Sequence, residues 1–415
     1  MQLRRSPNAP APALELPALG FGCMRFPGKG LGAIDLDASE RLVLQALDAG
    51  VTYFDTAYLY PGNEEALGQI VERNDIRDRL SIATKLPHHS VKAAPDFDRY
   101  LDASLKRLRT NRADFYLLHN MTSTAQWERL CNLGLREWAA RQKAAGRIGH
   151  LGFSFHGSQP EFLKLLGAYP WDFCQIQYNY ADQNYQAGRE GLERAAEKGI
   201  PVIIMEPLLG GKLAGDLPRA ASDLFMAAEK TRREQAGLVP ADVPESARTQ
   251  VAVAWGLRWL WDQPGVTMVL SGMNSPEQLA QNAATARDAL PGSLSPEERA
   301  MFAEVERVFC ASYKVPCTGC NYCMPCPQGI NIPGVFSSYN ASYQVDYKTG
   351  VMGYFMCAGA LGESPHYASD CVTCDKCMRH CPQGIRIPDE LKRARKRLEI
   401  PGAKTVMKVA ARFRV

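Results

Sequence analysis

Eight short apolar runs, rich in β-branched and aromatic residues, recur along the chain, and the first seven begin roughly 25 to 35 residues apart. They occupy residues 18–24, 51–57, 80–86, 113–119, 148–155, 173–180, 200–208 and 266–273. Amphipathic segments such as 39–50, 98–109 and 189–199 separate them and end in Gly or a basic residue, as helices often do. Strands that alternate with helices predict a parallel sheet, and eight such units close a (β/α)8 TIM barrel.

The alternative is an open, doubly wound sheet, which is also built from alternating strands and helices. Sheets of that kind that bind dinucleotides carry a G-x-G-x-x-G turn that opens the first helix. The first turn of this chain, GFGCMRFPGKG at residues 20–30, lacks that pattern. We therefore expect an α/β fold with a closed barrel.

The chain is 415 residues long, which exceeds what one compact domain usually holds. The alternation of strands and helices stops after residues 293–309, and a Cys-rich region begins at Cys310. We predict a barrel over residues 1–295 and a small, mainly helical, Cys-rich domain over residues 296–415. The long connection at 208–244 follows the seventh run and is either a lid over the barrel's site or a surface decoration.

Ionisable side chains stand at the ends of three successive runs, where barrels of this kind carry their catalytic groups. Asp55 is in the second run with Tyr60 five residues on, Lys85 is in the third and His119 ends the fourth. Tyrosine, with an ordinary pKa of about 10, is a reluctant acid at neutral pH. A nearby ammonium favours the phenolate, a carboxylate holds that ammonium, and a His donates to a carbonyl oxygen. Each residue alone would be an ordinary surface or packing residue, but together they predict a proton-donating unit.

The segments YFDTAYLYPGNEEALG, IATKL and DFYLLH resemble the aldo-keto reductases in residue type, order and spacing, and the resemblance covers residues 14–290. It implies that Tyr60 is the general acid, that Lys85 and Asp55 tune it, and that His119 orients the carbonyl. The implied substrate is a small carbonyl compound or alcohol, and the implied hydride carrier is NAD(H) or NADP(H).

The resemblance also implies a set of cofactor contacts. Gln175 and Ser154 stand where the family binds the carboxamide, but the Asn that follows this Ser in the family is Phe155 here. Met205 stands where the family has an aromatic residue that stacks on the nicotinamide, and residues 271–282 resemble the adenosine-phosphate loop. The residues expected to contact the cofactor are Arg25, Ser154, Gln175, Met205, Pro207, Leu208, Ser271, Gly272, Asn274, Gln278 and Asn282.

Coenzyme choice follows from two of these positions. Gly272 and Gln278 replace the basic residues that commonly grip a 2′-phosphate in the family. Nicotinamide binding is therefore expected without a preference for NADPH.

Nine of the thirteen cysteines fall between Cys317 and Cys381, and eight of these nine form two runs of four that each end in Cys-Pro. The second run matches the bacterial-ferredoxin pattern C-x2-C-x2-C-x3-C-P, and the first has one residue fewer before its last cysteine, Cys326. The segments CPQGINIP and CPQGIRIP are nearly identical, which indicates an internal repeat. We predict two 4Fe-4S clusters on Cys317, Cys320, Cys323, Cys326, Cys371, Cys374, Cys377 and Cys381.

Structural zinc is the competing interpretation, but zinc sites usually use two C-x2-C pairs set well apart. In two-cluster ferredoxins, which these runs resemble, the fourth cysteine of each run serves the other cluster. The resemblance implies one cluster on Cys317, Cys320, Cys323 and Cys381, and another on Cys371, Cys374, Cys377 and Cys326. Cys310, Cys357 and His366 lie nearby in the sequence and are expected to pack rather than to bind metal.

A nicotinamide passes two electrons as hydride, whereas a 4Fe-4S cluster passes one at a time, and flavin is the usual intermediary. Three interpretations stay open. The barrel is a carbonyl reductase with structural or redox-sensing clusters, or the clusters feed a flavin or radical step in the barrel, or the chain is an electron-transfer protein with an unused tetrad. The first is favoured. GFSFHG, MEPL and the CTGCNYCMPCP segment together resemble a prokaryotic subgroup of iron–sulfur aldo-keto reductases.

Charge and hydropathy limit the location and partners. The net charge of +4 argues against a general nucleic-acid binder, and no apolar run reaches the roughly 18 residues of a membrane span. No apolar stretch follows Arg4 and Arg5, so we expect a cytoplasmic protein. Residues 388–415 hold nine Lys and Arg against three Asp and Glu, which predicts a solvated helix that closes the last domain, or a docking surface for an acidic partner such as a redox protein.

Overall fold

A computed structural model of the chain describes residues 1–29, 33–238, 242–359, 365–400 and 402. Eight parallel strands close into a barrel in the order β10-β3-β4-β5-β6-β7-β8-β9. They are β3 (Leu19–Gly22), β4 (Tyr53–Asp55), β5 (Ser81–Leu86), β6 (Ala113–Met121), β7 (Ile148–Phe155), β8 (Phe173–Gln177), β9 (Val202–Met205) and β10 (Val266–Ser271). Each strand overlaps one of the eight apolar runs, so the closed barrel is confirmed and the open sheet is excluded.

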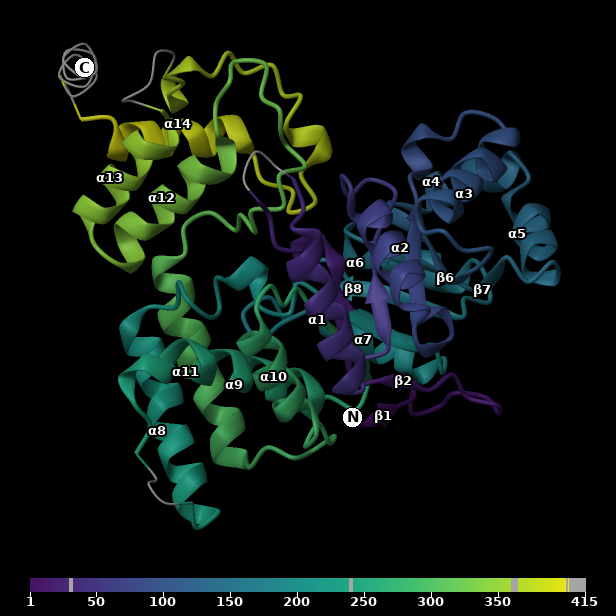
Figure 1. The fold of residues 1–415 in the computed structure, drawn as a ribbon. Coiled ribbons are helices and arrows are strands. Elements are labelled where there is room, and N and C mark those ends of the chain that lie inside the picture. The colour runs from purple at the N-terminus through teal and green to yellow at the C-terminus, as the bar shows by residue number, and fades with distance from the viewer. Residues whose placement is uncertain (30–32, 239–241, 360–364, 401, 403–415) are drawn as a thin grey trace. The chain divides into compact units, whose positions relative to one another are not determined.

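Helices connect successive strands of the barrel, and one more follows the last strand (Figure 1). They are α1 (Leu36–Asp48), α2 (Asn63–Asn74), α3 (Pro95–Arg107), α4 (Thr124–Asn132), α5 (Leu135–Ala144), α6 (Gln159–Gly167), α7 (Gly188–Glu197), α9 (Arg248–Asp262) and α10 (Pro276–Ala286). Helix α1 shows why they form: the Asp35 side chain caps its first turn by accepting a hydrogen bond from the Ala38 N–H, and Leu42 and Val43 lie on its buried face.

Large side chains fill the inside of the barrel. The ring of Phe115 lies 4.8 Å from that of Tyr53 and 5.2 Å from that of Phe173, and all three are buried. Leu117 and Ile203 extend the same cluster. A filled barrel has no pore, so loops at the carboxyl ends of the strands are where a site can form.

The N-terminus forms a feature that the periodicity did not predict. Two very short strands, β1 (Leu3–Arg4) and β2 (Leu16–Pro17), pair antiparallel ahead of the barrel. The buried Arg4 guanidinium donates to the carbonyl oxygen of Trp261 at 2.8 Å and to that of Gln263 at 3.0 Å. These bonds attach the segment to the end of α9.

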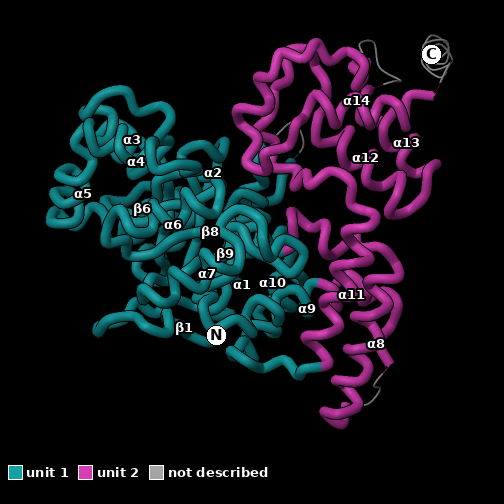
Figure 2. The backbone as a smooth tube through the Cα atoms, turned by 180° about the vertical axis from the view of Figure 1, so that it is seen from behind, with its two compact units in different colours: residues 1–207, 253–296 teal, residues 208–252, 297–415 magenta. Residues whose placement is uncertain are grey.

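The chain divides into two compact units, one of residues 1–207 and 253–296 and the other of residues 208–252 and 297–415 (Figure 2). Residue 295, which we propose as the domain boundary in sequence, adjoins the start of α11 (Pro296–Ser312). The long connection after the seventh run falls in the second unit, where α8 (Arg219–Gln235) packs its Phe225 ring 5.5 Å from the Phe302 ring of α11. A lid function for this connection stays a prediction.

Three helices make up most of the C-terminal part of the second unit: α12 (Ile332–Gln344), α13 (Tyr347–Cys357) and α14 (Ile387–Leu398). Phe336, Tyr354 and Leu391, one from each helix, belong to one buried core against which the half-buried cysteines pack. The expected small, mainly helical domain is confirmed.

The basic C-terminal segment is described only in part. Helix α14 buries Ile387, Leu391 and Leu398 and leaves Lys392 and Lys396 exposed, as a solvated helix would. The other half of this segment, residues 401 and 403–415, lies outside the described residues. Within the part of the chain that the structure describes, no helix is both long and apolar enough to cross a bilayer.

Candidate active site and candidate cluster sites

The ends of β4 and β5 bring an acid and a base together at the carboxyl-end face of the barrel. The Lys85 ammonium donates to Asp55 Oδ1 at 2.5 Å and to the carbonyl oxygen of Thr56 at 2.8 Å. Both side chains are almost fully buried, with 1% of Lys85 and 5% of Asp55 exposed. Removing either partner would leave the other as an uncompensated buried charge, so the pair holds its geometry firmly.

Tyr60 and His119 complete the predicted tetrad. Lys85 Nζ lies 3.5 Å from the Tyr60 hydroxyl oxygen and 4.9 Å from the centre of the Tyr60 ring. The Tyr60 and His119 rings meet edge to face, with centres 5.7 Å apart and planes at 86°. Tyr60 is half-buried, whereas His119 is buried. Of these two side chains, Tyr60 is therefore the more exposed.

Burial sets the electrostatics of the tetrad. Burial raises the pKa of Asp55. The Lys85 ammonium and the Gln175 amide oppose this shift, because both stabilise the carboxylate. Burial also lowers the pKa of His119 well below 6.5, and the charges of Lys85 and His156 lower it further. His119 is therefore neutral at pH 7, and a neutral imidazole carries one N–H donor.

Two predicted cofactor residues stand next to the tetrad. Ser154 on β7 and Gln175 on β8 are register partners, and both are buried. Gln175 Nε2 donates to Asp55 Oδ2 at 3.2 Å, which joins the expected carboxamide contact directly to the acid–base pair. The Ser154 hydroxyl accepts a hydrogen bond from the Asn120 backbone N–H at 2.8 Å.

The expected phosphate-binding loop is ordered by its own side chains. Asn282 Nδ2 donates to Ser271 Oγ at 3.1 Å, and Gln278 Oε1 accepts from the Asn274 N–H at 3.0 Å. Gly272 lies against Arg25: a Cβ at this glycine would lie 2.6 Å from Arg25 Cγ. The side chain of Arg25, a basic residue, therefore packs against Gly272, one of the two uncharged replacements.

The remaining expected contacts lie at the end of β9 and directly after it. Met205 is the last residue of that strand and is half-buried. Glu206 adopts φ 52°, and Pro207 ends the first unit. Leu208 begins the connection that belongs to the second unit.

Sequence reasoning missed a bulge in β6. Leu118 pairs with Phe153 and Met121 with Phe155, so His119 and Asn120 together oppose the single residue Ser154. Asn120 has φ 59°, in the left-handed region that Asn tolerates better than most residues. The letters HNM contain no glycine or proline that would have signalled this irregularity.

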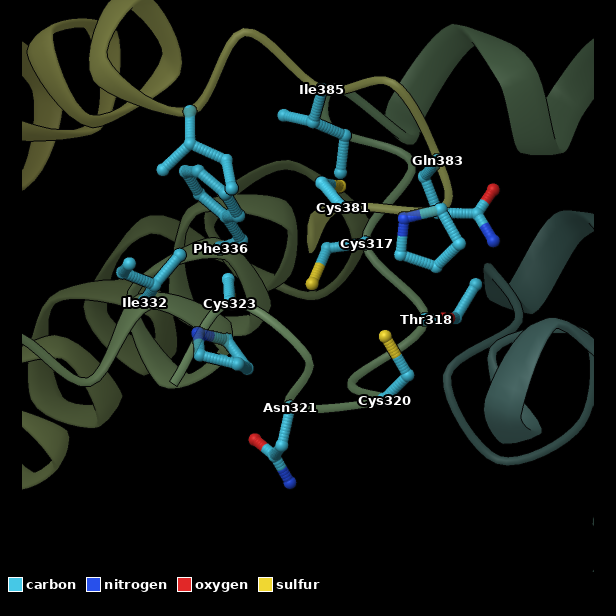
Figure 3. Close-up of a pocket in the computed structure, with 13 residues that line it drawn as sticks. Cys317, Thr318, Cys320, Asn321, Cys323, Ile332, Phe336, Cys381, Gln383 and Ile385 are labelled. Atoms are coloured by element: carbon cyan, nitrogen blue, oxygen red, sulfur yellow. The ribbon is translucent and has the colours of Figure 1, made fainter. Parts of the chain in front are cut away.

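Four cysteines, three neighbours in the sequence and one distant from them, line one small cavity in the second unit (Figure 3). They are Cys317, Cys320, Cys323 and Cys381. Ile332, Phe336 and Ile385 provide apolar walls. Burial raises the pKa of Cys323 to about 12, with a further contribution from the other three cysteines. The last cysteine of the second run thus lies with the first three of the first run.

The other four cysteines also lie near one another, since three of them affect the pKa of the fourth, Cys377. Burial raises the pKa of Cys377 to about 11, and Cys371, Cys326 and Cys374 raise it further. Cys374 is the most exposed of this set. Among the described residues, no three His, Cys, Asp or Glu side chains meet closely enough to hold a single metal ion.

The neighbouring residues that were expected to pack do not join these groups. The Cys357 thiol donates to the carbonyl oxygen of Tyr354 at 3.2 Å. Cys310 is exposed on α11, so the expectation that it is a buried packing residue is wrong. The His366 ring covers Gly329, where a Cβ would lie 2.6 Å from it.

Comparison with known proteins finds one family model over the barrel part of the chain and another over its Cys-rich part. The model of the aldo/keto reductase family matches residues 18–298, and the model of the 4Fe-4S dicluster domain matches residues 316–385. The aldo-keto reductase yakc of Schizosaccharomyces pombe, whose name specifies NADP(+), is 27% identical over 212 residues. These residues cover 48% of this chain and 60% of that protein.

Two further relatives cover more of their own length. An aldo-keto reductase of Gibberella moniliformis is 27% identical over 294 residues, 68% of this chain and 84% of that protein. The solved structure of an aldo-keto reductase from Bacillus halodurans in its holo form superposes with a TM-score of 0.55 at 22% identity, over 74% of this chain and 96% of that one. This structural likeness speaks for the fold alone.

Proposed function

Since the chain belongs to the aldo/keto reductase family and carries a C-terminal 4Fe-4S dicluster domain, we propose that its barrel reduces a carbonyl group, or oxidises an alcohol, with a nicotinamide dinucleotide. The observation that carries this proposal is the contact of one buried ammonium, Lys85, with both Asp55 and Tyr60. A nicotinamide, when bound, supplies or accepts hydride. The protein's own task is then to bind the carbonyl and deliver a proton.

Tyr60 is the proposed proton donor to the carbonyl oxygen. A cation beside a phenol stabilises the phenolate, so the Lys85 ammonium makes the Tyr60 hydroxyl readier to give up its proton. Asp55 keeps Lys85 charged and in place through the 2.5 Å contact. Neutral His119 donates its N–H to the same carbonyl oxygen and orients it.

The residues at the mouth fit a carboxamide-bearing ring. Gln175 Oε1 is buried and has no hydrogen-bond partner among the described residues, although the Nε2 of the same side chain is bonded to Asp55. A buried acceptor without a partner is costly, so a ligand N–H at this point would relieve it. Ser154 and Gln175 are therefore the proposed carboxamide contacts.

The two groups of cysteines fit two 4Fe-4S clusters, since four thiols around each site are the usual ligand set of a cubane. Cys317, Cys320, Cys323 and Cys381 would hold one cluster, and Cys371, Cys374, Cys377 and Cys326 the other. The clusters would supply one-electron transfer. Burial of the thiols means that binding iron must displace their protons. Such clusters suit the cytoplasm, where we place the protein.

The second candidate function is electron transfer through the clusters with an inactive barrel, which the exposure of Cys374 favours. An anaerobic assay of NADH oxidation with a panel of aldehydes and ketones separates the two functions. Our proposal expects oxidation that requires the carbonyl compound. Electron exchange with redox dyes without carbonyl reduction would favour the second candidate, and an absorption spectrum of the same protein would show any bound flavin by its own bands.

Coenzyme preference is a separate expectation. NADH should bind at least as tightly as NADPH, because Gly272 carries no charge and the Gln278 side chain is bonded to Asn274. Titration calorimetry with both dinucleotides measures this. A tenfold preference for NADPH would contradict it, and its loss in Arg25→Ala would assign the 2′-phosphate to Arg25, the cation beside Gly272.

A further inference from the structure

Asn120, whose backbone N–H reaches Ser154, carries a second buried acceptor. Asn120 Oδ1 is buried and has no hydrogen-bond partner among the described residues, as is also true of Gln175 Oε1. The backbone N–H of Asn120 donates to Ser154 Oγ at 2.8 Å, and Gln175 is the register partner of Ser154 on the next strand. Ser154 thus lies between two residues that each have an unsatisfied amide oxygen.

The bulge in β6 is what puts Asn120 there. Side chains of a regular strand alternate between its two faces, so the residue after His119 would face away from the barrel interior. Because His119 and Asn120 together oppose Ser154, the alternation is broken at this point. The left-handed φ of 59° and the bond to Ser154 fix the bulge. Bulges commonly serve to redirect a side chain next to a site.

The residue after Ser154 on β7, Phe155, has no amide group that could contact a carboxamide. In the family that the chain resembles, an Asn follows the Ser of this strand, and here the position is Phe155. Its ring is fully buried and packs 5.2 Å from the Phe162 ring of α6, so it offers no polar contact. Strand β7 therefore carries no amide directly after Ser154, whereas β6 carries one, Asn120, opposite Ser154.

We propose that Asn120 is a cofactor-positioning residue that accepts one N–H of the nicotinamide carboxamide, an inference that rests on the proposed nicotinamide binding. A carboxamide offers two N–H donors and one acceptor oxygen. Gln175 Oε1 and Asn120 Oδ1 take one N–H each. Ser154 already accepts the Asn120 N–H, so its own hydroxyl hydrogen is left to donate to the carboxamide oxygen.

The test compares two ligands on two forms of the full-length protein. NAD⁺ carries the carboxamide, whereas its 3-acetylpyridine analogue has a methyl ketone there and no N–H. Asn120→Gly removes the side chain and tolerates φ 59°, and it keeps the backbone N–H that Ser154 requires. Loss of one hydrogen bond of this kind should weaken NAD⁺ binding roughly tenfold and leave the affinity for the analogue unchanged. Titration calorimetry gives both affinities.

Asn120→Asp serves as the matched variant, because it keeps an acceptor oxygen at the same place and should retain most of the discrimination between the two ligands. Equal loss of affinity for both ligands in Asn120→Gly, or no loss for either, would overturn the assignment of Asn120 while leaving nicotinamide binding intact. If the unchanged protein binds neither dinucleotide, it is the proposed function that fails.

Discussion

Tyr60→Phe is expected to lower kcat by about 10² to 10⁴-fold, the usual contribution of general acid catalysis. The substitution keeps the ring, and with it the edge-to-face contact to His119, but removes the proton that the substrate oxygen needs. Affinity for the dinucleotide should stay close to that of the unchanged protein, because its proposed contacts do not include the Tyr60 hydroxyl. Steady-state kinetics with a carbonyl substrate from the panel, together with a binding titration, measures both quantities.

Tyr58→Phe is the matched control in the same loop. Tyr58 stacks under the Arg107 guanidinium at 4.3 Å and against the Tyr100 ring at 5.0 Å, contacts that its ring alone provides. This control should keep full activity. Lys85→Met should impair the same proton transfer as Tyr60→Phe, so the double variant should be little slower than the slower single one. Full turnover by Tyr60→Phe would mean that the tetrad is not used.

The double variant Cys317→Ala/Cys381→Ala should retain one intact cluster and bind about four irons per chain, against about eight in the unchanged protein. The reason is that Cys317 and Cys381 line the same cavity, although they lie 64 residues apart in the sequence. Two thiols are too few to hold a cubane, so one cluster is lost and the other group keeps all four ligands. Iron and acid-labile sulfide, measured after anaerobic purification, give the result.

Cys317→Ala/Cys326→Ala is the contrasting variant, since it takes one ligand from each group rather than two from one. It should perturb both clusters. If the clusters were each built from one sequence run, the two variants would exchange their behaviour: the first would damage both clusters and the second only one. Two zinc ions per chain without visible absorption would contradict iron–sulfur clusters altogether.

The parts of the fold that local patterns encode were predictable. Strands of the barrel are mainly apolar runs, so β5 and β8 could be predicted from the sequence. Asp55 and Lys85 could be placed at one site because parallel strands end at the same face of a barrel. The short pairing of Leu3–Arg4 with Leu16–Pro17 was not visible, because two residues cannot establish a period.

Contacts between residues that are distant in the sequence could not be predicted from local patterns. The connection that contains α8 belongs to the second unit through contacts such as Phe225 with Phe302, which no sequence period encodes. The bulge at Asn120 depends on the partner strand, because β6 has one residue more than β7 between two pairings. The grouping of Cys381 with the first run was expected only from resemblance to ferredoxins. Residue types thus predict which chemistry is present, and tertiary pairing decides which of those residues meet.

The most direct test of the proposed reaction follows the hydrogen itself. The protein is incubated anaerobically with NADH that carries deuterium at both C4 positions and a carbonyl substrate, and the alcohol is analysed by mass spectrometry. Hydride transfer in the barrel predicts one deuterium on the carbinol carbon of each product molecule, since no exchange with solvent intervenes. NADH oxidation that yields alcohol without deuterium would contradict the account, because the electrons would then have reached the substrate through the clusters or another carrier.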